Sequence, residues 1–236
     1  MCGRYVSPEQ AEIERLWHIG RHNLDPFGRR FNVSPASPVP ALLLNRATGQ
    51  LELVIARWGL IPVWWKEPKP PRMTHNARSE EAAIKPMWKA ALGKSRCLIP
   101  ALGWYEWKQV ERTDPATGEI IQAKQPYFLH VPQTVPFAFA GLIALRRAAS
   151  DAQWEASCAI LTRDAVGPAA EVHDRMPVLL SKGQEHDWLD ARITDPAQAM
   201  ASALGTGLSA LEYHPVSSRV NISRNDDAGL VEKVGE

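Results

Sequence analysis

Cysteine is scarce in this chain of 236 residues, which contains three, at positions far apart. Cys2, Cys97 and Cys158 are odd in number and form no CxxC pair, which argues against both a disulfide framework and a zinc knuckle. Scattered cysteines of this kind favour a reducing compartment. We expect neither a metal ion nor a cofactor.

Long apolar runs and an excess of charge of one sign are also missing. No stretch approaches the roughly eighteen consecutive apolar residues of a membrane-spanning helix, and the N-terminal region has no apolar signal-peptide core. The formal net charge is +1, so a generally basic, DNA-coating surface is not indicated. Any nucleic-acid contact is then a local patch, and we expect a soluble cytoplasmic protein.

Short apolar runs of strand length dominate the chain, in which 45% of the residues are hydrophobic, ample for a core. The runs VPALLLN (39–45) and LELVIARW (51–58) flank a turn-rich segment and predict a hairpin. No linker long enough to divide the chain is visible, so the sequence predicts one β-rich α+β domain. Further strands are expected at 1–6, 96–100, 104–110, 119–131, 137–145, 155–162, 176–180 and 211–217, with a turn at 114–118.

Helices are expected to be few and short. Ser7 as N-cap, Pro8 at the first helical position and Gln10 completing a capping box predict a helix near the N-terminus. The polar tail over 223–236 is expected to be loosely held, after a folded domain over 1–222. The other helices are expected after Ser79, near Ser181 and after Asp195-Pro196.

The sharpest candidate for chemistry is Cys2, directly behind the initiator methionine. If Met1 is removed, Cys2 carries an α-amine with a pKa of about 7.7–8.0 beside a thiol with a pKa of about 8.5. The amine can form an imine with an aldehyde, and the thiolate can then close a five-membered thiazolidine ring. The same pair could equally serve a self-activated amidase, with the thiol as nucleophile and the amine as base. A nearby cation such as Arg4 would increase the thiolate share.

Two other stretches contain groups suited to proton transfer. Glu106 lies among aromatic residues in GWYEWK, and an apolar setting tends to raise the pKa of a carboxyl group towards neutrality. The competing interpretation is a strand whose acidic residue faces water. His173 and Asp174 stand directly before the apolar MPVLL run, but sequence neighbours need not face one another, so a His–Asp dyad is not secured.

Two further loops carry side chains that could bind a ligand. Asn76 and Arg78 come just before a helix cap at Ser79, and the plainer interpretation is a capping loop with a solvated arginine. Trp64 and Trp65 lie in a stretch rich in proline and lysine, where exposed tryptophans can form a stacking platform for bases. The alternative is a pair of tryptophans that seals an edge of the core.

These stretches belong to an ordered set of motifs, which are MCGRY (1–5), RRFNVSP (29–35), WGLIPVWWK (58–66), NARSE (76–80), RCLIPALGWYEW (96–107), KQPYF (124–128), FAGL (139–142), VHDRMPVLL (172–180) and HPVSSRVN (214–221). The set resembles the SOS response-associated peptidase family, whose members shield abasic sites in single-stranded DNA. The resemblance covers nearly the whole chain. It depends on the order of the motifs rather than on any single one.

The resemblance implies a compact α+β fold, mostly β, with a barrel-like or bifurcated sheet, short flanking helices and a positively charged channel for single-stranded DNA. It implies that Cys2, exposed by removal of Met1, forms a thiazolidine with the ring-opened sugar aldehyde of an abasic site. Asn76 would hydrogen-bond the sugar, Glu106 would assist ring opening and proton transfer, and His173 would shuttle protons in crosslinking and its reversal. The DNA-binding positions implied in the same way are Arg4, Asn32, Pro35, Trp64, Trp65, Arg78, Thr162 and Arg175.

The resemblance also implies an enzyme of peptidase type that processes its own N-terminus and has abasic-site crosslinking and lyase activity. Its partner would be single-stranded DNA containing abasic sites, and the protein would be associated with the nucleoid when bound to DNA. Nothing in the sequence demands a dimer, so we expect a monomer. Cys97 and Cys158 match no required role, so we assign them to the core. Two rival hypotheses stay open: an N-terminal-nucleophile cysteine peptidase or amidase with another substrate, and a non-catalytic binder of single-stranded nucleic acid.

Overall fold

The chain is built on two β-sheets with short helices around them. The computed structural model describes residues 2–20, 25–67, 69–113, 117–147, 154–205 and 210–235. The elements are β1 (Tyr5–Ser7), α1 (Gln10–Trp17), β2 (Arg30–Val33), β3 (Pro38–Leu44), β4 (Leu51–Trp58), β5 (Asn76–Arg78), α2 (Ser79–Ala82), α3 (Pro86–Lys94), β6 (Arg96–Ala101), β7 (Gly103–Thr113), β8 (Ile120–His130), β9 (Phe137–Arg147), β10 (Trp154–Asp164), β11 (Arg175–Pro177), β12 (Leu179–Leu180), α4 (Lys182–Leu189), α5 (Pro196–Leu204) and β13 (Glu212–Pro215).

Five strands of the larger sheet close into a barrel. Their order is β10-β4-β3-β6-β9, and β9 pairs again with β10, which completes the ring. The predicted hairpin is β3–β4, in continuous antiparallel register from Pro38 opposite Arg57 to Leu44 opposite Leu51. β10 also pairs with β5, in parallel, so the barrel wall holds the short strand that carries Asn76. The predicted β-rich α+β fold is confirmed.

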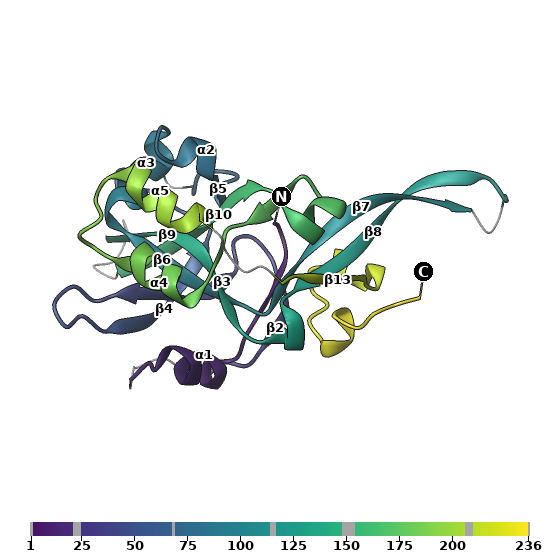
Figure 1. The fold of residues 1–236 in the computed structure, drawn as a ribbon, viewed down its shortest axis with the longest axis horizontal. Coiled ribbons are helices and arrows are strands. Elements are labelled where there is room, and N and C mark those ends of the chain that lie inside the picture. Colours follow the sequence, from purple (N-terminus) through teal and green to yellow (C-terminus); the bar gives the residue numbers. More distant parts are fainter. Residues whose placement is uncertain are drawn as a thin grey trace.

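The second sheet has the order β13-β8-β7-β1-β2 and joins the N-terminal strand to the C-terminal one. β7 and β8 pair from Trp104 opposite Leu129 to Thr113 opposite Ile120. Beyond β1 and β13 this pair continues as a two-stranded ribbon that projects from the body, at the right of Figure 1. The turn predicted at 114–118 falls partly on residues 114–116, which lie outside the described residues.

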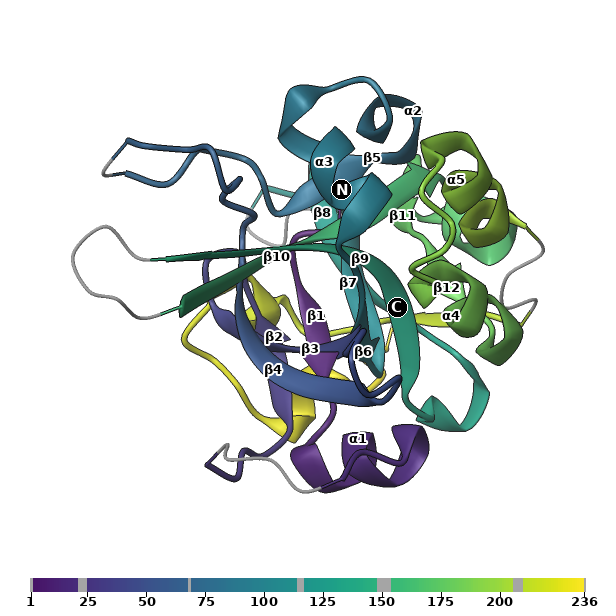
Figure 2. The same ribbon diagram turned by 90° about the vertical axis from the view of Figure 1, so that its left-hand side faces the viewer.

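The helices pack mainly at one end of the barrel. Figures 1 and 2 show α2, α3, α4 and α5 gathered there, whereas α1 lies apart from them. The helices at Ser181 and Asp195 begin as predicted, and both residues accept a hydrogen bond from the backbone three residues on. None of the helices in the described ranges has the length and apolar character needed to span a membrane.

Some predicted boundaries were wrong. The N-cap of α1 is Glu9, which forms a capping box with Glu12, because Ser7 still belongs to β1. The helix over 86–94 was not predicted, since its three buried side chains form too sparse a pattern to recognise. The expected strand at 1–6 begins only at Tyr5, and the strand expected at 176–180 is two short strands, β11 and β12. The N-cap of α2 is Arg78 rather than Ser79.

The C-terminal tail is packed against the domain, so the expectation of a loosely held tail was wrong. Leu230 is fully buried in a core cluster with Val6 and Tyr105. Asp226 accepts hydrogen bonds from the backbone N–H groups of Phe31 and Asn32. Polar composition misled the prediction because one buried leucine and a few backbone contacts are enough to fix such a segment.

Candidate active site at the N-terminus

Cys2 lies at the start of the chain segment that β1 pins to the second sheet. β1 pairs antiparallel with β7, with Tyr5 opposite Trp104, and the N–H of Tyr105 donates to the Arg4 carbonyl at 3.0 Å. Because the pairing is antiparallel, the residues before Tyr5 run towards Glu106. Cys2 is fully buried there. The structure therefore fixes Cys2 beside the strand that carries the predicted carboxyl group.

Asn76 makes a direct contact with Cys2. The parallel pairing of β5 with β10 sets Asn76 opposite Ile160, and its Nδ2 donates to the Cys2 carbonyl oxygen at 2.7 Å. Asn76 is 8% exposed, and its Oδ1 finds no hydrogen-bond partner in the part of the chain that the structure describes. A buried acceptor without a partner is costly, so Oδ1 keeps the capacity to accept one further hydrogen bond.

Glu106 is buried next to the same segment, with 2% of its surface exposed. Burial raises its pKa from 4.5 to about 7, because a low-dielectric setting penalises the charged form. The charged carboxylate also contributes to raising the pKa of the Cys2 thiol. A carboxyl group that titrates near neutrality can both accept and deliver a proton at pH 7.

His173 connects Glu106 with the surface. Its Nε2 lies 3.8 Å from Glu106 Oε2, and its Nδ1 lies 2.7 Å from Oδ1 of Asp174. Nδ1 also lies 2.9 Å from the backbone nitrogen of Arg175. Burial lowers the pKa of His173 and so favours the neutral ring. Asp174 does face His173, which the sequence left open.

The thiol of Cys2 is not activated in the way the sequence predicted. Burial is the main cause that raises its pKa well above the usual value, and the carboxylate of Glu106 raises it further. The guanidinium of Arg4 points elsewhere, and the help that Arg4 gives to the thiolate comes from its backbone N–H. The expectation that the cation of Arg4 would increase the thiolate share was therefore wrong, because its guanidinium is bound to Asn32 and Val220 and burial dominates the pKa of the thiol.

Arg4 and Asn32 tie the N-terminal strands to the C-terminal segment. Nη1 of Arg4 donates to Asn32 Oδ1 at 2.9 Å and to the Val220 carbonyl at 3.0 Å. Nδ2 of Asn32 meets the carbonyls of Val220, Ile222 and Asn225. The amide of Asn32 is thus fully used within the protein, and Asn32 is 1% exposed.

Three more of the predicted DNA-binding residues, Arg78, Thr162 and Arg175, differ in their exposure. Arg78 is exposed and lies two residues from Asn76 on β5, so both side chains leave the strand on the same face. Arg175 is buried, and it binds both carboxylate oxygens of Glu80 at 2.8 and 3.0 Å. Arg175 also donates to the carbonyl of Thr162, a fully buried residue.

The predicted tryptophan platform lies in the loop after β4. The rings of Trp64 and Trp65 are 5.9 Å apart and tilted by 56°. Trp64 is 49% exposed, and the indole N–H of Trp65 donates to the Lys69 carbonyl. Trp64 therefore does not seal the core, which was one of the two interpretations of the sequence. Pro35, another predicted DNA-binding residue, is half-buried in the turn between β2 and β3.

Trp58 is a positioning residue that the sequence did not single out. Its indole N–H donates to the His75 carbonyl at 2.8 Å, and its ring meets Tyr5 edge to face at a centroid distance of 5.3 Å. Trp58 thus holds the residue before Asn76 against the strand that follows Cys2. The sequence signal was present, since Trp58 opens the WGLIP motif, but a buried tryptophan cannot be told from an exposed one by sequence alone.

The four residues predicted to be catalytic therefore come together from distant parts of the chain. The Asn76 side chain is hydrogen-bonded to the Cys2 backbone, Glu106 and His173 lie 3.8 Å apart, and the imidazole is the most exposed of the four side chains. Within the described ranges, no group of three or more His, Cys, Asp or Glu side chains could hold a metal ion. The arrangement suits nucleophilic chemistry assisted by proton transfer.

Known proteins resemble this chain over nearly its whole length. The sequence matches the family model described as SOS response associated peptidase over residues 1–223. It is 32% identical to the abasic site processing protein YoqW of Bacillus subtilis (strain 168), covering 98% of this chain and 99% of that protein. It is 30% identical to the abasic site processing protein YedK of Escherichia coli (strain K12), with 99% and 100% covered.

Solved structures show the same fold. A protein from Bacteroides thetaiotaomicron superposes with a TM-score of 0.80 at 20% identity, over 99% of this chain and all of that one. A phage-related protein from Bordetella bronchiseptica superposes with a TM-score of 0.66 at 32% identity, over 91% of this chain and 94% of that one. The resemblance found in the motifs is confirmed by a match over most of the chain. The chain belongs to the SOS response associated peptidase family.

Proposed function

We propose that this protein processes abasic sites in single-stranded DNA by covalent capture of the sugar aldehyde on Cys2. The observation that carries the proposal is the meeting at Cys2 of the Asn76 amide and the buried carboxyl group of Glu106. Proteins that resemble this chain over nearly its whole length are named abasic site processing proteins. The proposal assigns the chemistry to the N-terminal residue once Met1, which lies outside the described residues, has been removed.

The reaction needs three proton transfers at one place. The Cys2 amine attacks the aldehyde carbon of the ring-opened sugar, and loss of one water gives the imine. The thiol then adds across the C=N bond, so that a C–S bond forms, the thiol proton is released and the nitrogen gains a proton. The product is a five-membered thiazolidine, and the net change is the loss of one water.

Glu106 and His173 are suited to these transfers. With a pKa of about 7, Glu106 can take a proton from the amine or thiol and return it to the departing hydroxyl group. His173 links this buried carboxyl group to solvent, because its side chain is 26% exposed and that of Asp174 is 85% exposed. Reversal of the crosslink uses the same steps in the opposite order and takes up one water. Cleavage of the DNA strand from the imine is included in the proposal as a side activity.

The DNA strand would be held by phosphate and base contacts, since an abasic site offers no base to recognise. We assign direct contact to Arg78, which is exposed beside Asn76, and base stacking to Trp64 and Trp65. Arg4 and Pro35 are proposed to line the strand's path. Polar atoms of the last three predicted residues are engaged within the protein, so we propose that these residues shape the site: Asn32, Thr162 and Arg175.

Removal of Met1 by this same site belongs to the proposal, with the Cys2 thiol as nucleophile. A peptidase or amidase acting on other substrates is the alternative, and it would release product from added peptides with repeated turnover. Turnover separates the two hypotheses, because self-processing removes one Met1 from each protein molecule, whereas a peptidase would cleave many added peptide molecules.

The test is crosslinking to a single strand that carries one abasic site, with an intact strand as control. The expected result is a heat-stable adduct with the abasic strand and none with the intact strand. Cys2→Ala should abolish the adduct, whereas Cys158→Ala, which removes a buried thiol of the barrel, should retain it in the folded protein. Full crosslinking by Cys2→Ala would overturn the proposal.

A further inference from the structure

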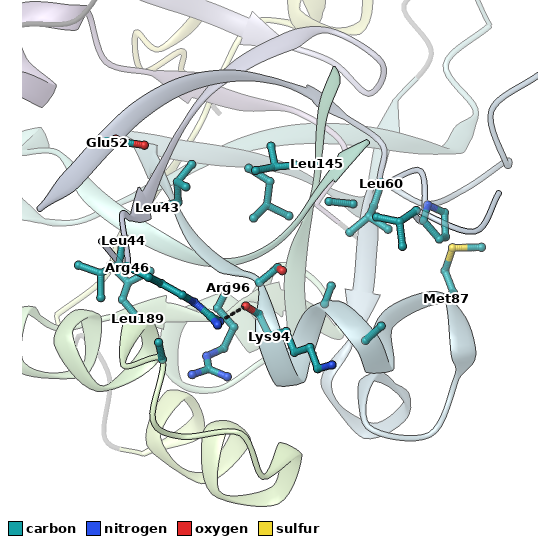
Figure 3. A pocket seen from close by; sticks show the side chains of 18 of the residues that line it. Leu43, Leu44, Arg46, Glu52, Leu60, Met87, Lys94, Arg96, Leu145 and Leu189 are labelled. Carbon is teal, nitrogen blue, oxygen red and sulfur yellow. Dashed lines mark hydrogen bonds between the residues drawn. The ribbon is translucent and has the colours of Figure 1, made fainter. Parts of the chain in front are cut away.

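A cavity of about 530 Å³ lies between α3, the loop after β4 and the β3–β4 hairpin (Figure 3). This volume is within the range of about 300–1,000 Å³ that is usual for ligand sites. The four residues proposed to be catalytic do not line it. Its walls are largely apolar, and the side chains that matter for the argument are Leu43, Leu60, Val63, Trp64, Met87 and Leu145.

The rim of the cavity leaves large apolar side chains in water. Val63 is 64% exposed, Trp64 is 49% exposed and Leu145 is 44% exposed. Exposed apolar side chains grouped around a hollow favour contact with another molecule. A small ligand on the floor of the cavity would leave this rim in water, whereas a polypeptide segment would cover the floor and the rim together.

One end of the cavity is positively charged. Arg46, Lys94 and Arg96 line this end, and Nη2 of Arg46 donates to the Lys94 carbonyl at 2.6 Å (Figure 3). Burial lowers the pKa of Arg96, Asp190 acts in the opposite direction, and the like charge of Arg46 lowers it again. The carboxylate of Asp190 is itself bound by Arg192. Arg96 is buried and donates to the carbonyls of Leu92, Trp188 and Asp190, whereas Arg46 and Lys94 are exposed, so these two cations are the ones placed to meet an anion.

Acidic side chains do little to neutralise this end. Among the lining residues that the structure describes, the acidic one is Glu52, and its Oε1 accepts a hydrogen bond from Asn45. The two exposed cations, Arg46 and Lys94, outnumber this one carboxylate and leave the lining positive, although the whole chain carries a formal charge of only +1. The cavity thus combines an apolar hollow with a cationic end, and its ligand should have the opposite pattern.

We propose that this cavity binds an acidic peptide segment of a partner protein. One bulky apolar side chain of the segment enters the hollow, and its acidic residues lie beside Arg46 and Lys94. This interaction requires neither DNA nor Cys2. Because Trp64 lines the cavity and is also assigned to base stacking, the peptide and the DNA strand would compete for this side chain.

The test uses the full chain and a fluorescein-labelled peptide of five aspartates followed by Gly-Leu-Phe, measured by fluorescence anisotropy. Two control peptides replace the aspartates by asparagines or the last two residues by serines. The first peptide should bind, each control should bind at least tenfold more weakly, and added salt should weaken the binding by screening. Free dodecanoate should compete poorly.

Two substitutions on α3 give a matched pair. Lys94→Gln removes a charge that lines the cavity and should weaken binding by about twofold to fivefold. Lys89→Gln removes an exposed charge of the same helix that does not line the cavity, and it should leave binding unchanged. Ala90→Trp, placed on the cavity wall, should fill the hollow and reduce binding at least tenfold, with the unfolding temperature recorded to confirm a folded variant.

Three results would overturn the proposal. The first is that the acidic peptide does not bind, or binds no better than the two control peptides. The second is equal weakening by Lys89→Gln and Lys94→Gln, which would indicate general charge attraction. The third is displacement of the peptide by dodecanoate at equal concentration, which would identify the cavity as a site for fatty acids.

Discussion

Replacing Glu106 by glutamine should remove a pH dependence from the stability of the protein. Glu106 is 2% exposed, and burial raises its pKa from 4.5 to about 7. In the unfolded chain this carboxyl group titrates near its ordinary value, so between these two values the folded protein binds the proton more firmly than the unfolded chain does. The free energy of unfolding therefore falls as pH rises from 4.5 to 7.

The size of the effect follows from the two pKa values. At about 1.4 kcal/mol per pH unit, the rise from 4.5 to about 7 corresponds to about 3 kcal/mol. Between pH 4.5 and pH 8 the wild type should lose about 3 kcal/mol of unfolding free energy that Glu106→Gln does not lose. Glutamine keeps the shape of the side chain and carries no charge, so the variant should be more stable than the wild type above pH 7.

Urea unfolding at a series of pH values, followed by tryptophan fluorescence, measures this difference. Glu111→Gln is the matched control, because Glu111 lies on the same strand and is exposed. The control should keep the pH dependence of the wild type. If Glu106→Gln keeps it too, Glu106 does not titrate as a buried carboxyl group, and the reasoning about its role as a proton carrier fails.

Three further predictions concern the frame of the site. Asn76→Ala removes the donor to the Cys2 carbonyl and should slow crosslinking at least tenfold while lowering the unfolding free energy by only about 1 kcal/mol; crosslinking at the wild-type rate would contradict this. Arg175→Lys loses the paired hydrogen bonds to Glu80 and should cost about 1–2 kcal/mol in urea unfolding, and no loss would mean that the pairing is not formed in solution. Leu230→Ala should cost about 2–5 kcal/mol in the same assay, whereas a value near zero would restore the loosely held tail.

Much of the fold could be predicted because apolar runs and turn residues are local signals. The hairpin of β3 and β4 and the helix starts at Ser181 and Asp195 needed information from only a few neighbouring residues. Closure of the barrel could not be predicted from neighbouring residues, because it depends on the pairing of β9 with both β6 and β10. Such pairings join segments far apart in the chain, and a single sequence gives no register between them.

The candidate site was predictable in its residues but not in its electrostatics. The motifs located Cys2, Asn76, Glu106 and His173, and the structure brings all four together. The sequence could not show that Cys2 is buried, and burial raises the pKa of the thiol more than its neighbours lower it. Desolvation depends on the surrounding atoms of the folded chain, which explains why the sign of this pKa shift was missed.

The central claim is that both the amine and the thiol of Cys2 bond to the aldehyde carbon, and mass spectrometry of the adduct tests it directly. After crosslinking, the DNA and protein are digested, treated with iodoacetamide and analysed as peptides. We expect the N-terminal peptide to begin at Cys2, to carry the sugar with the loss of one water, and to resist alkylation at sulfur. A crosslinked peptide that retains Met1, or whose Cys2 thiol is alkylated, would contradict the account.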